Sequence, residues 1–373
     1  MIYFDNAATG GFKPNSVIDS TCSVIKYLSA NPGRSGHRLS ITGAETIYKC
    51  RSAIADLFNG TAERVVFTKN CTEALNLAIL GTLKVGGHII TTVFEHNSVI
   101  RPLISLKQKG LIELDIVCPS KDGIVQAIEE KIKPNTYLVV TTAISNVNGE
   151  GLPINQIGSL CRKNGVLYLV DGAQAGGHIT IDIKKDMINM LALAGHKGLY
   201  GIMGSGALVF DQDVNILPLI YGGTGSESFN LNQPTNYPES LESGTLNLPA
   251  IASLLEGVNL IKNNINNFSN HLFSYTQKAI EGLSSCSKVK CYSKPNKAGI
   301  VAFRIDELSS EVVADKLNYE FDIAVRGGLH CAPLMHEFLK TKEEGLVRIS
   351  FAVQNTTREI DYFIKAIKTI AQC

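Results

Sequence analysis

The sequence Leu-Ala-Leu-Ala-Gly-His-Lys-Gly-Leu-Tyr-Gly-Ile-Met-Gly-Ser-Gly, residues 191–206, sets one lysine, Lys197, in a glycine-rich loop. A short apolar run leads into the loop, and a second one, residues 207–210, follows it. Glycines let the backbone approach a ligand closely. Burial lowers the pKa of a lysine introduced by apolar residues, so its neutral amine can form a Schiff base with an aldehyde. Glycine-rich loops also hold phosphates or simply turn, so the loop alone does not decide between these uses.

The second signal lies upstream. Residues 166–173, Val-Leu-Tyr-Leu-Val-Asp-Gly-Ala, have the pattern of a buried strand that ends on Asp171. Ligands of open α/β sheets bind at the carboxyl ends of the strands. An acid there is also typical of the N-cap of a following helix. Together with Lys197, however, Asp171 suits the partner that a pyridine nitrogen requires, and the pair predicts a pyridoxal phosphate site.

Composition limits the classes of function. The 373 residues, 45% hydrophobic and 18% charged, are typical of a globular protein with two domains. The formal net charge is +1 and there is no basic run, which argues against nucleic acid and anionic membrane as partners. The sequence contains no apolar run of about 18 residues and no basic segment typical of a signal peptide. Nine cysteines without a Cys-x-x-Cys pair predict neither a disulfide framework nor a metal site, and we expect a cytoplasmic protein.

Strand and helix patterns alternate through the first part of the chain. This alternation predicts parallel βαβ units with short connections. The candidate strands are residues 64–68, 88–93, 111–117 and 136–142, and the candidate helices between them are 72–82, 98–109 and 124–132.

A different mixture follows residue 248 and predicts a smaller α+β domain. Its candidate strands are residues 300–305, 323–325 and 347–351, and its candidate helices are 249–263, 269–283, 310–319 and 359–370. We expect an N-terminal segment, residues 1–14, that packs with this small domain. The large domain is then residues 15–248, and the small domain is residues 249–373.

Polar residues follow several of the strands in the large domain. Thr68-Lys-Asn-Cys-Thr72 is a strand-to-helix turn, and the free N–H groups of such a helix start favour an anion. Alternatively, Thr72 is only an N-cap. His96 follows the strand at 88–93, and Asn146 follows the strand at 136–142, so both are expected at the carboxyl edge of the sheet.

The sequence contains an Asp-Gly-Ala-Gln motif from residue 171, followed by a Gly-His-Lys motif that ends at Lys197. These two motifs in this order resemble the class V aminotransferases, which are fold-type I pyridoxal phosphate enzymes. Within them the sequence is most similar to the cysteine desulfurases and selenocysteine lyases. The resemblance runs from residue 3 to residue 350, nearly the whole chain. It implies an α/β fold in which a large domain has a mostly parallel sheet flanked by helices, with a smaller α+β C-terminal domain.

The resemblance also implies pyridoxal 5'-phosphate as cofactor and a role for each matching residue. Lys197 is the lysine that links to the cofactor, Asp171 pairs with its ring nitrogen, and His96 stacks on the ring and is placed to move a proton. The phosphate is assigned to Cys71 and Thr72. The other implied cofactor contacts are Asn146, Gln174, His196 and, across the interface of a homodimer, Thr224.

Arg326-Gly-Gly-Leu-His-Cys331-Ala resembles the Arg-x-Gly-x-x-Cys-Ala motif of the SUF-like, group II desulfurases. A thiolate attacks sulfur, and adjacent cations such as Arg326 and His330 favour the thiolate. The resemblance implies that Cys331 accepts the sulfur of the substrate and that Arg348 binds its carboxylate through a planar fork. The implied substrate-binding set is Ala8, Asn146, Arg326 and Arg348.

The predicted function is therefore a cysteine desulfurase that converts L-cysteine to L-alanine with a persulfide on Cys331 and passes the sulfur to a protein acceptor. Two departures from the family pattern affect it: Ala194 replaces a serine that would contact the phosphate, and Leu329 replaces the first histidine of His-His-Cys. Selenocysteine lyase, another C–S lyase and an epimerase remain as alternatives within the family. A sulfur-carrier or scaffold protein that keeps the fold without turnover is the alternative outside catalysis.

Overall fold

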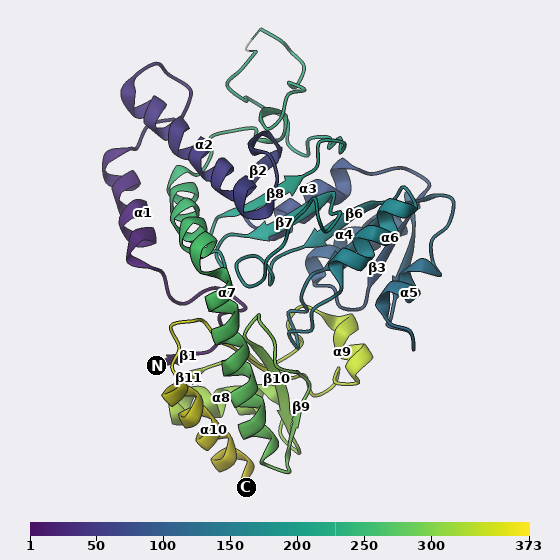
Figure 1. Cartoon of the computed structure of the whole chain (residues 1–373), viewed down its shortest axis with the longest axis vertical. Helices are drawn as coiled ribbons and strands as arrows, with labels where there is room; N and C mark the ends of the chain where they lie inside the picture. The colour runs from purple at the N-terminus through teal and green to yellow at the C-terminus, as the bar shows by residue number, and fades with distance from the viewer. Residues whose placement is uncertain (228) are drawn as a thin grey trace.

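In the computed structural model of the chain, which describes residues 1–227 and 229–373, seven strands form one sheet in the order β2-β8-β7-β6-β5-β3-β4 (Figure 1). The strands are β2 (Val65–Thr68), β3 (Gly87–Thr92), β4 (Ile112–Val117), β5 (Thr136–Thr142), β6 (Leu167–Asp171), β7 (Met190–Ala194) and β8 (Gly206–Phe210). From β4 to β7 all neighbours are parallel, whereas β8 runs antiparallel to both β7 and β2.

Both faces of this sheet are buried, as expected for parallel strands. Successive residues of β7 show it: Leu191 and Leu193 lie in one apolar cluster, and Met190 and Ala192 lie in the other. The first cluster includes side chains of α2 (Arg38–Phe58), α5 (Ile124–Glu129), α6 (Ile154–Lys163) and the start of α7 (Leu248–Ser284). The second is closed by α3 (Cys71–Gly81) and α4 (Asn97–Gln108). The sheet is thus a middle layer between two layers of helices.

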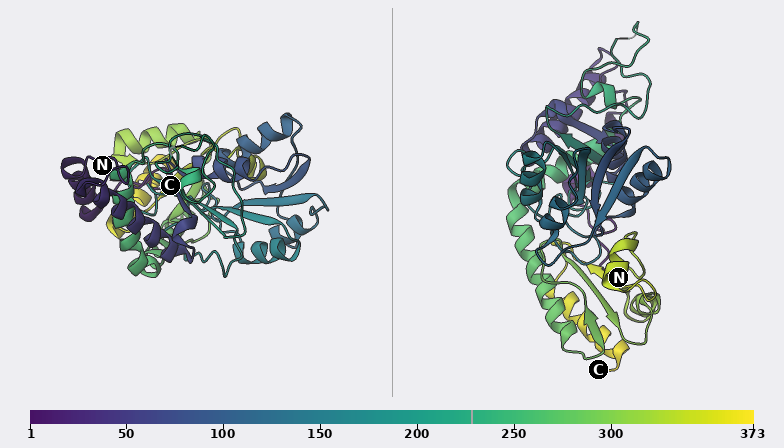
Figure 2. Two further views of the ribbon diagram at one scale, coloured as in Figure 1. Left: turned by 90° about the horizontal axis from the view of Figure 1, so that it is seen from above. Right: turned by 90° about the vertical axis from the view of Figure 1, so that its right-hand side faces the viewer.

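A single helix, α7, runs from the large sheet to the C-terminal part of the chain (Figures 1 and 2). It packs against α1 (Asn15–Tyr27) and α2 at its start and against α10 (Thr357–Ala371) and β9 (Val289–Cys291) further along. Two separate helices, 249–263 and 269–283, were predicted here, and that prediction is wrong. Residues 262–268 are rich in asparagine and at most half-buried, but they contain no proline or glycine, so the helix continues between the two cores.

The C-terminal part has its own apolar core. Its antiparallel sheet has the order β12-β10-β9, where β10 is Ile300–Ile305 and β12 is Val347–Ser350. Helices α7, α8 (Ser310–Phe321) and α10 bury Leu272, Leu317 and Phe363 against it. A capping box between Thr356 and Glu359 satisfies the N–H groups at the start of α10.

The first residues of the chain join this smaller core. Strand β1 (Ile2–Tyr3) pairs in parallel with β11 (Ile323–Ala324), and Phe4 packs edge-on against Phe351. The N-terminal segment then turns toward the large sheet, where the Gly10 N–H donates to the carbonyl oxygen of His196. The two ends of the chain therefore both lie in the smaller part (Figure 1).

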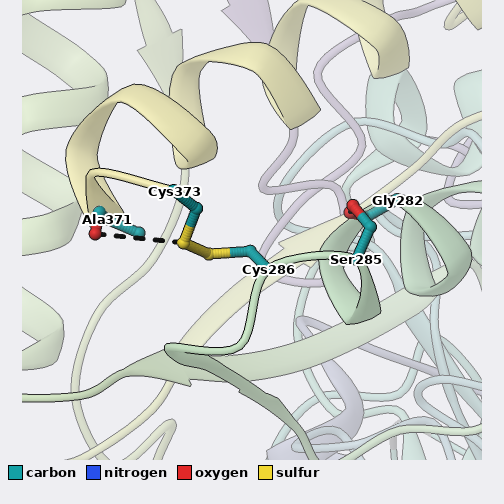
Figure 3. Close-up of a disulfide and its surroundings, with 5 residues drawn as sticks. All are labelled: Gly282, Ser285, Cys286, Ala371 and Cys373. Atoms are coloured by element: carbon teal, nitrogen blue, oxygen red, sulfur yellow. Dashed lines mark hydrogen bonds between the residues drawn. A yellow bond between two sulfur atoms is a disulfide. The ribbon is translucent and has the colours of Figure 1, made fainter.

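The structure pairs Cys286, just after α7, with the terminal Cys373 in a disulfide whose Cα atoms are 5.7 Å apart (Figure 3). The sequence predicted no disulfide framework. It gave no sign of this single bridge either, because its partners are 87 positions apart and only the packing of α10 on α7 brings them together.

Among residues 1–227 and 229–373, no helix combines the length and the apolar character needed to cross a membrane. No group of histidine, cysteine and acidic side chains in that part of the chain is arranged to hold a metal ion.

Candidate active site

The carboxyl ends of β6 and β7 bring the two predicted central residues together. Asp171 is the last residue of β6 and is paired with Ala192 of β7, so the loop that follows Ala194 carries Lys197 past the end of β6. Both side chains line one cavity. The cavity residues that the sequence had singled out are Cys71, Thr72, His96, Asn146, Asp171, Gln174, His196 and Lys197.

The first turn of α3 forms one wall of the cavity. The Asn70 side chain caps this helix by accepting from the backbone N–H of Glu73, and Cys71 and Thr72 are its first two residues. Strand β8 comes very close to this start: a Cβ at Gly206 would lie 2.7 Å from the carbonyl carbon of Asn70. Glycine is therefore required at 206 for the loop after Lys197 to return beside the anion-favouring helix end.

The electrostatics of the cavity favour a neutral amine on Lys197. Burial lowers the pKa of Lys197, while the carboxylate of Asp171 acts in the opposite direction. Burial and the neighbouring Lys197 lower the pKa of His196 to about 4, so this imidazole is neutral at physiological pH. A neutral lysine amine is the form that condenses with an aldehyde.

His96 is held in one tautomer. It is the N-cap of α4, and its Nδ1 accepts from the backbone N–H of Ser98 at 3.1 Å. Burial lowers the pKa of His96, so the ring is neutral and its proton lies on Nε2. The sequence analysis missed Ser98, whose hydroxyl lies 2.9 Å from His96 Nδ1 and 2.7 Å from Thr72 Oγ1. The feature of the sequence that could have indicated Ser98 is its hydroxyl at the second residue of the helix that His96 caps.

Two amide side chains complete the wall near the N-terminal segment. Gln174 donates from Nε2 to the carbonyl oxygen of Ala7 at 2.9 Å, while its buried Oε1 has no partner among the described residues. Asn146 donates from Nδ2 to the carbonyl oxygen of His330 at 2.7 Å. The predicted Ala8 is next to Ala7 in the chain but does not line the cavity.

The loop of Cys331 is bonded to the start of helix α4. The backbone N–H of Asn97, the first residue of α4, donates to the Cys331 carbonyl oxygen at 2.7 Å. His330 and Cys331 both have left-handed backbones, with φ of 50° and 57°, which non-glycine residues adopt only when their surroundings hold them. Nη2 of Arg326 lies 3.6 Å from the Cys331 sulfur, and the side chain of Cys331 is half-buried.

The predicted contribution of His330 to the charge at Cys331 is wrong. His330 is only 2% exposed, and burial together with nearby arginines lowers its pKa well below the ordinary range. A neutral imidazole carries no charge that stabilises a thiolate. Of the two predicted cations, Arg326 and His330, it is Arg326 that contacts the Cys331 sulfur.

Arg348 lies between the two parts of the molecule. It is 1% exposed; Nη2 bonds the carboxylate of Asp5 and Nη1 the carbonyl oxygen of Asn146, both at 2.9 Å. Its Nε is buried without a partner among the described residues. The backbones of Arg348 and Arg326 also exchange two hydrogen bonds, which form an isolated antiparallel β-bridge between the two arginines.

Thr224 is not part of this cavity. It lines a separate hollow with residues of the loop at 31–34 and with the buried ion pair of Arg51 and Glu242. Within one chain, the structure therefore does not bring Thr224 to Lys197.

Known proteins of similar sequence and structure identify the family of this chain. The model of the aminotransferase class-V family matches residues 2–363. The chain belongs to this family. This class V chain is 33% identical to a probable cysteine desulfurase of Pyrococcus abyssi. The aligned region covers 100% of this chain and 94% of that protein. The chain is 30% identical to the cysteine desulfurase of Enterobacter sp., covering 99% and 93%.

A solved structure agrees with the family assignment. The apo structure of a cysteine desulfurase from Thermococcus onnurineus NA1 matches with a TM-score of 0.93 at 30% identity, covering 100% of this chain and 94% of that chain. These relatives confirm the predicted fold-type I architecture of this class V aminotransferase. They also confirm its predicted cofactor, pyridoxal 5'-phosphate, which the family uses.

The residues of the cavity fit that cofactor. Lys197 supplies an amine. The unpartnered Oε1 of Gln174, and Oδ2 of Asp171, whose Oδ1 is already bonded, would accept hydrogen bonds from a ligand in the cavity. The start of α3 supplies free N–H groups for a phosphate. The hydroxyl pair of Thr72 and Ser98 lies at the same wall, where Ala194 has none.

Glu95 is a buried carboxyl beside the cavity. Its Oε1 accepts from the Thr92 hydroxyl at 2.5 Å and from the Thr142 N–H at 3.1 Å, and its Oε2 has no partner among the described residues. Burial raises the pKa of Glu95 to about 8. Glu95 is therefore protonated in the folded protein at neutral pH, although it is ionised in the unfolded chain.

We predict that Glu95→Gln removes a pH dependence of stability. Between the ordinary glutamate pKa and pH 8, the folded wild type binds one proton that the unfolded chain does not. Its free energy of unfolding therefore falls by about 1.4 kcal/mol for each pH unit. The variant lacks this contribution, so urea unfolding of the cofactor-free proteins at pH 5.5, 6.5 and 7.5 should give it a flatter profile. The exposed Glu63→Gln is the control and keeps the wild-type slope; equal slopes for all three proteins would contradict the assignment.

Proposed function

We propose that this class V aminotransferase is a cysteine desulfurase, which converts L-cysteine to L-alanine and leaves the abstracted sulfur as a persulfide on Cys331. The observation that carries the proposal is the contact between Arg326 and the Cys331 sulfur, on a loop tied to the first residue of α4. A guanidinium beside a thiol favours the nucleophilic thiolate. The same tie fixes Cys331 relative to His96, the neighbouring residue at that helix end.

The proposed roles of the other residues follow from their chemistry. Lys197, with its lowered pKa, holds the cofactor and takes the α-proton of the substrate. Asp171 pairs with the ring nitrogen, and His96 packs against the ring. When bound, pyridoxal phosphate supplies a ring that accepts electrons from the substrate carbon. The phosphate is held by Thr72 and the first N–H groups of α3.

The substrate carboxylate is assigned to Arg348 and Asn146, whose contacts with each other and with the Cys331 loop place a planar cation near the proposed nucleophile. Arg348 also holds Asp5, so substrate binding would involve the N-terminal segment that includes Ala8. In the sulfur transfer itself, the Cys331 sulfur forms a bond to the substrate sulfur while the bond from that sulfur to Cβ breaks. The electron pair of the broken bond stays with carbon, which takes up a proton and becomes the methyl group of alanine.

A SUF-like, group II assignment is the finer proposal within the family. It is supported by the short connection that carries Cys331, which lies between the end of β11 at Ala324 and the start of α9 (Pro333–Leu339). Cys331 is half-buried, so a protein thiol that receives the sulfur could reach it. We also infer a reducing compartment such as the cytoplasm, because the thiol of Cys331 must be reduced to react; the Cys286–Cys373 disulfide is the one feature described that argues for an oxidising one.

The central test is Cys331→Ser. The variant should still bind the cofactor, because Cys331 is not part of the cavity that contains Lys197, but alanine formation from L-cysteine should fall by at least 100-fold, since a serine hydroxyl forms no stable persulfide. Wild type without added thiol should form about one alanine per site and then stop. Mass spectrometry should then show one added sulfur on the peptide that contains Cys331.

The exposed Cys118→Ser is the matched control and should behave as wild type. If the added sulfur maps to another cysteine, or if Cys331→Ser turns over L-cysteine at the wild-type rate, the proposal fails and a C–S lyase becomes the better account. Retention of selenide release from L-selenocysteine by the variant would instead favour selenocysteine lyase activity.

We further propose that the active unit is a homodimer. Thr224, assigned to the phosphate of the partner's cofactor, lies outside the cavity of its own chain. The loop between β8 and η2 (Glu239–Leu241), which includes Thr224, projects away from both termini (Figure 1). It exposes Ile220, Tyr221, Phe229 and Leu231. A two-fold partner would cover these side chains and bring two equivalent loops to two equivalent sites.

We predict that the double change Phe229→Asp and Leu231→Asp produces a monomer, because charges would be buried in the proposed interface. Sedimentation should show the wild type as a dimer and the variant as a monomer that releases its cofactor faster. Tyr319→Asp, an exposed aromatic position on α8, is the control and should remain dimeric. A wild-type monomer with full activity at the assay concentration would contradict the proposal.

We also propose a division of the chain into an N-terminal segment, a large domain and a small domain. The pairing of β1 with β11 supports an N-terminal segment, residues 1–14, that belongs with the small domain. The apolar cluster formed by the end of α7, β10, α8, β12 and α10 supports a small domain within 249–373, and the clusters on the two faces of the large sheet support a large domain at 15–248, although the start of α7 also packs into one of them.

A further inference from the structure

The two carboxylate oxygens of Asp171 have different surroundings. Oδ1 accepts the backbone N–H of Ala173 at 2.9 Å, and it also accepts the thiol of Cys71, whose sulfur lies 3.4 Å away. Among the residues that the structure describes, no group donates to Oδ2. Asp171 is 4% exposed and Cys71 is 7% exposed, so water competes little for either group. One oxygen is thus held by protein donors and the other is left for a ligand.

Cys71 is suited to be a permanent donor. Burial raises its pKa well above the ordinary range, and the neighbouring Asp171 carboxylate raises it further. The thiol therefore keeps its proton at physiological pH. Its position is also fixed, because Cys71 is the first residue of α3, whose start is capped by Asn70 and packed under Gly206.

The same surroundings exclude Cys71 as a second sulfur acceptor. A thiolate at this position would face a carboxylate at 3.4 Å in a buried site, where like charges repel strongly. Cys331 has the opposite environment, a half-buried thiol with a guanidinium nitrogen 3.6 Å from its sulfur. The chain therefore holds two thiols near one site with opposite tasks: one stays protonated and the other reacts.

We propose that Cys71 is a positioning residue for Asp171: its S–H and the Ala173 N–H fix Oδ1, so that Oδ2 is held for the ring nitrogen of pyridoxal phosphate. The inference rests on the proposed role of Asp171. It makes the protonation of the ring nitrogen depend on a thiol that does not itself touch the substrate. Loss of the thiol leaves Asp171 with one anchor on Oδ1 and freedom to rotate about the bond that joins its carboxylate to Cβ.

The test compares holoenzymes of wild type, Cys71→Ala, Cys71→Ser and Cys161→Ala. Cys161 on α6 is 0% exposed and lies in an apolar cluster, so Cys161→Ala removes a buried sulfur without removing a contact to Asp171. Each protein is loaded with pyridoxal phosphate labelled with ¹⁵N in the ring, and solid-state ¹⁵N NMR reports whether that nitrogen is protonated. The second readout is exchange of the substrate α-proton with deuterium from solvent.

In wild type and Cys161→Ala, the ¹⁵N shift should be that of a protonated ring nitrogen. In Cys71→Ala, the shift should move toward the unprotonated value and α-deuterium exchange should fall roughly three- to ten-fold, as expected from the loss of one weak hydrogen bond. Cys71→Ser, which keeps a donor on a shorter bond, should restore most of both signals. A wild-type ¹⁵N shift in Cys71→Ala, or an equal change in Cys161→Ala, would overturn the inference.

Failure of the underlying role of Asp171 would look different. If wild type itself shows an unprotonated nitrogen, or if Asp171→Asn keeps the wild-type shift, Asp171 does not pair with the ring and the proposed function loses that step. If wild type and Asp171→Asn behave as expected while Cys71→Ala is unchanged, only the role of Cys71 fails.

Discussion

The parallel pairing of β6 with β7 is the constraint on which the rest of the site depends. It brings the end of β6, at Asp171, beside the start of the loop that carries Lys197, and both polar side chains lie at the edge of a sheet whose two faces are apolar. Burial there lowers the pKa of Lys197, while Asp171 limits the shift through its negative charge. The lysine is thus shifted toward its neutral form while it keeps a counter-charge nearby. The close packing of Gly206 against the start of α3 adds an anion site to the same edge.

The second constraint is the way in which the smaller part of the molecule reaches this edge. Cys331 lies in that part, yet its backbone is bonded to Asn97, and the backbone of His330 is bonded to the side chain of Asn146. These bonds hold two consecutive residues in left-handed conformations that cost free energy in isolation. Arg348 crosses the same boundary through the carbonyl oxygen of Asn146. Together these contacts hold the loop of Cys331 against the helix end that begins after His96 and against Asn146, which lines the cavity of Lys197.

Much of this arrangement could be predicted from the sequence, because it follows from the ends of strands. Asp171 and His96 come directly after apolar strands, and the carboxyl ends of parallel strands share one edge. The prediction failed where local pattern and tertiary packing differ. Two helices, 249–263 and 269–283, were predicted where α7 is continuous. The short strand β9 and helix α9 were not predicted, since neither has enough residues to show a period.

Electrostatic details depend on burial and could not be read from spacing. His330 is adjacent to Cys331 in the chain, but its imidazole is buried and neutral. The thiol of Cys71 meets Asp171, 100 positions away, only because α3 and β6 are neighbours in space. The sequence likewise did not show that a second lysine, Lys13, is partly buried nearby, where it donates to the His196 carbonyl oxygen at 3.2 Å and burial lowers its pKa to about 8.

The central claim, that the amine of Lys197 holds the cofactor, is tested most directly by borohydride reduction of the holoenzyme followed by peptide mapping. The account predicts that the reduced pyridoxal phosphate adduct lies on Lys197 and that the peptide containing Lys13 is unmodified. An adduct on Lys13, or on any lysine other than Lys197, would contradict it.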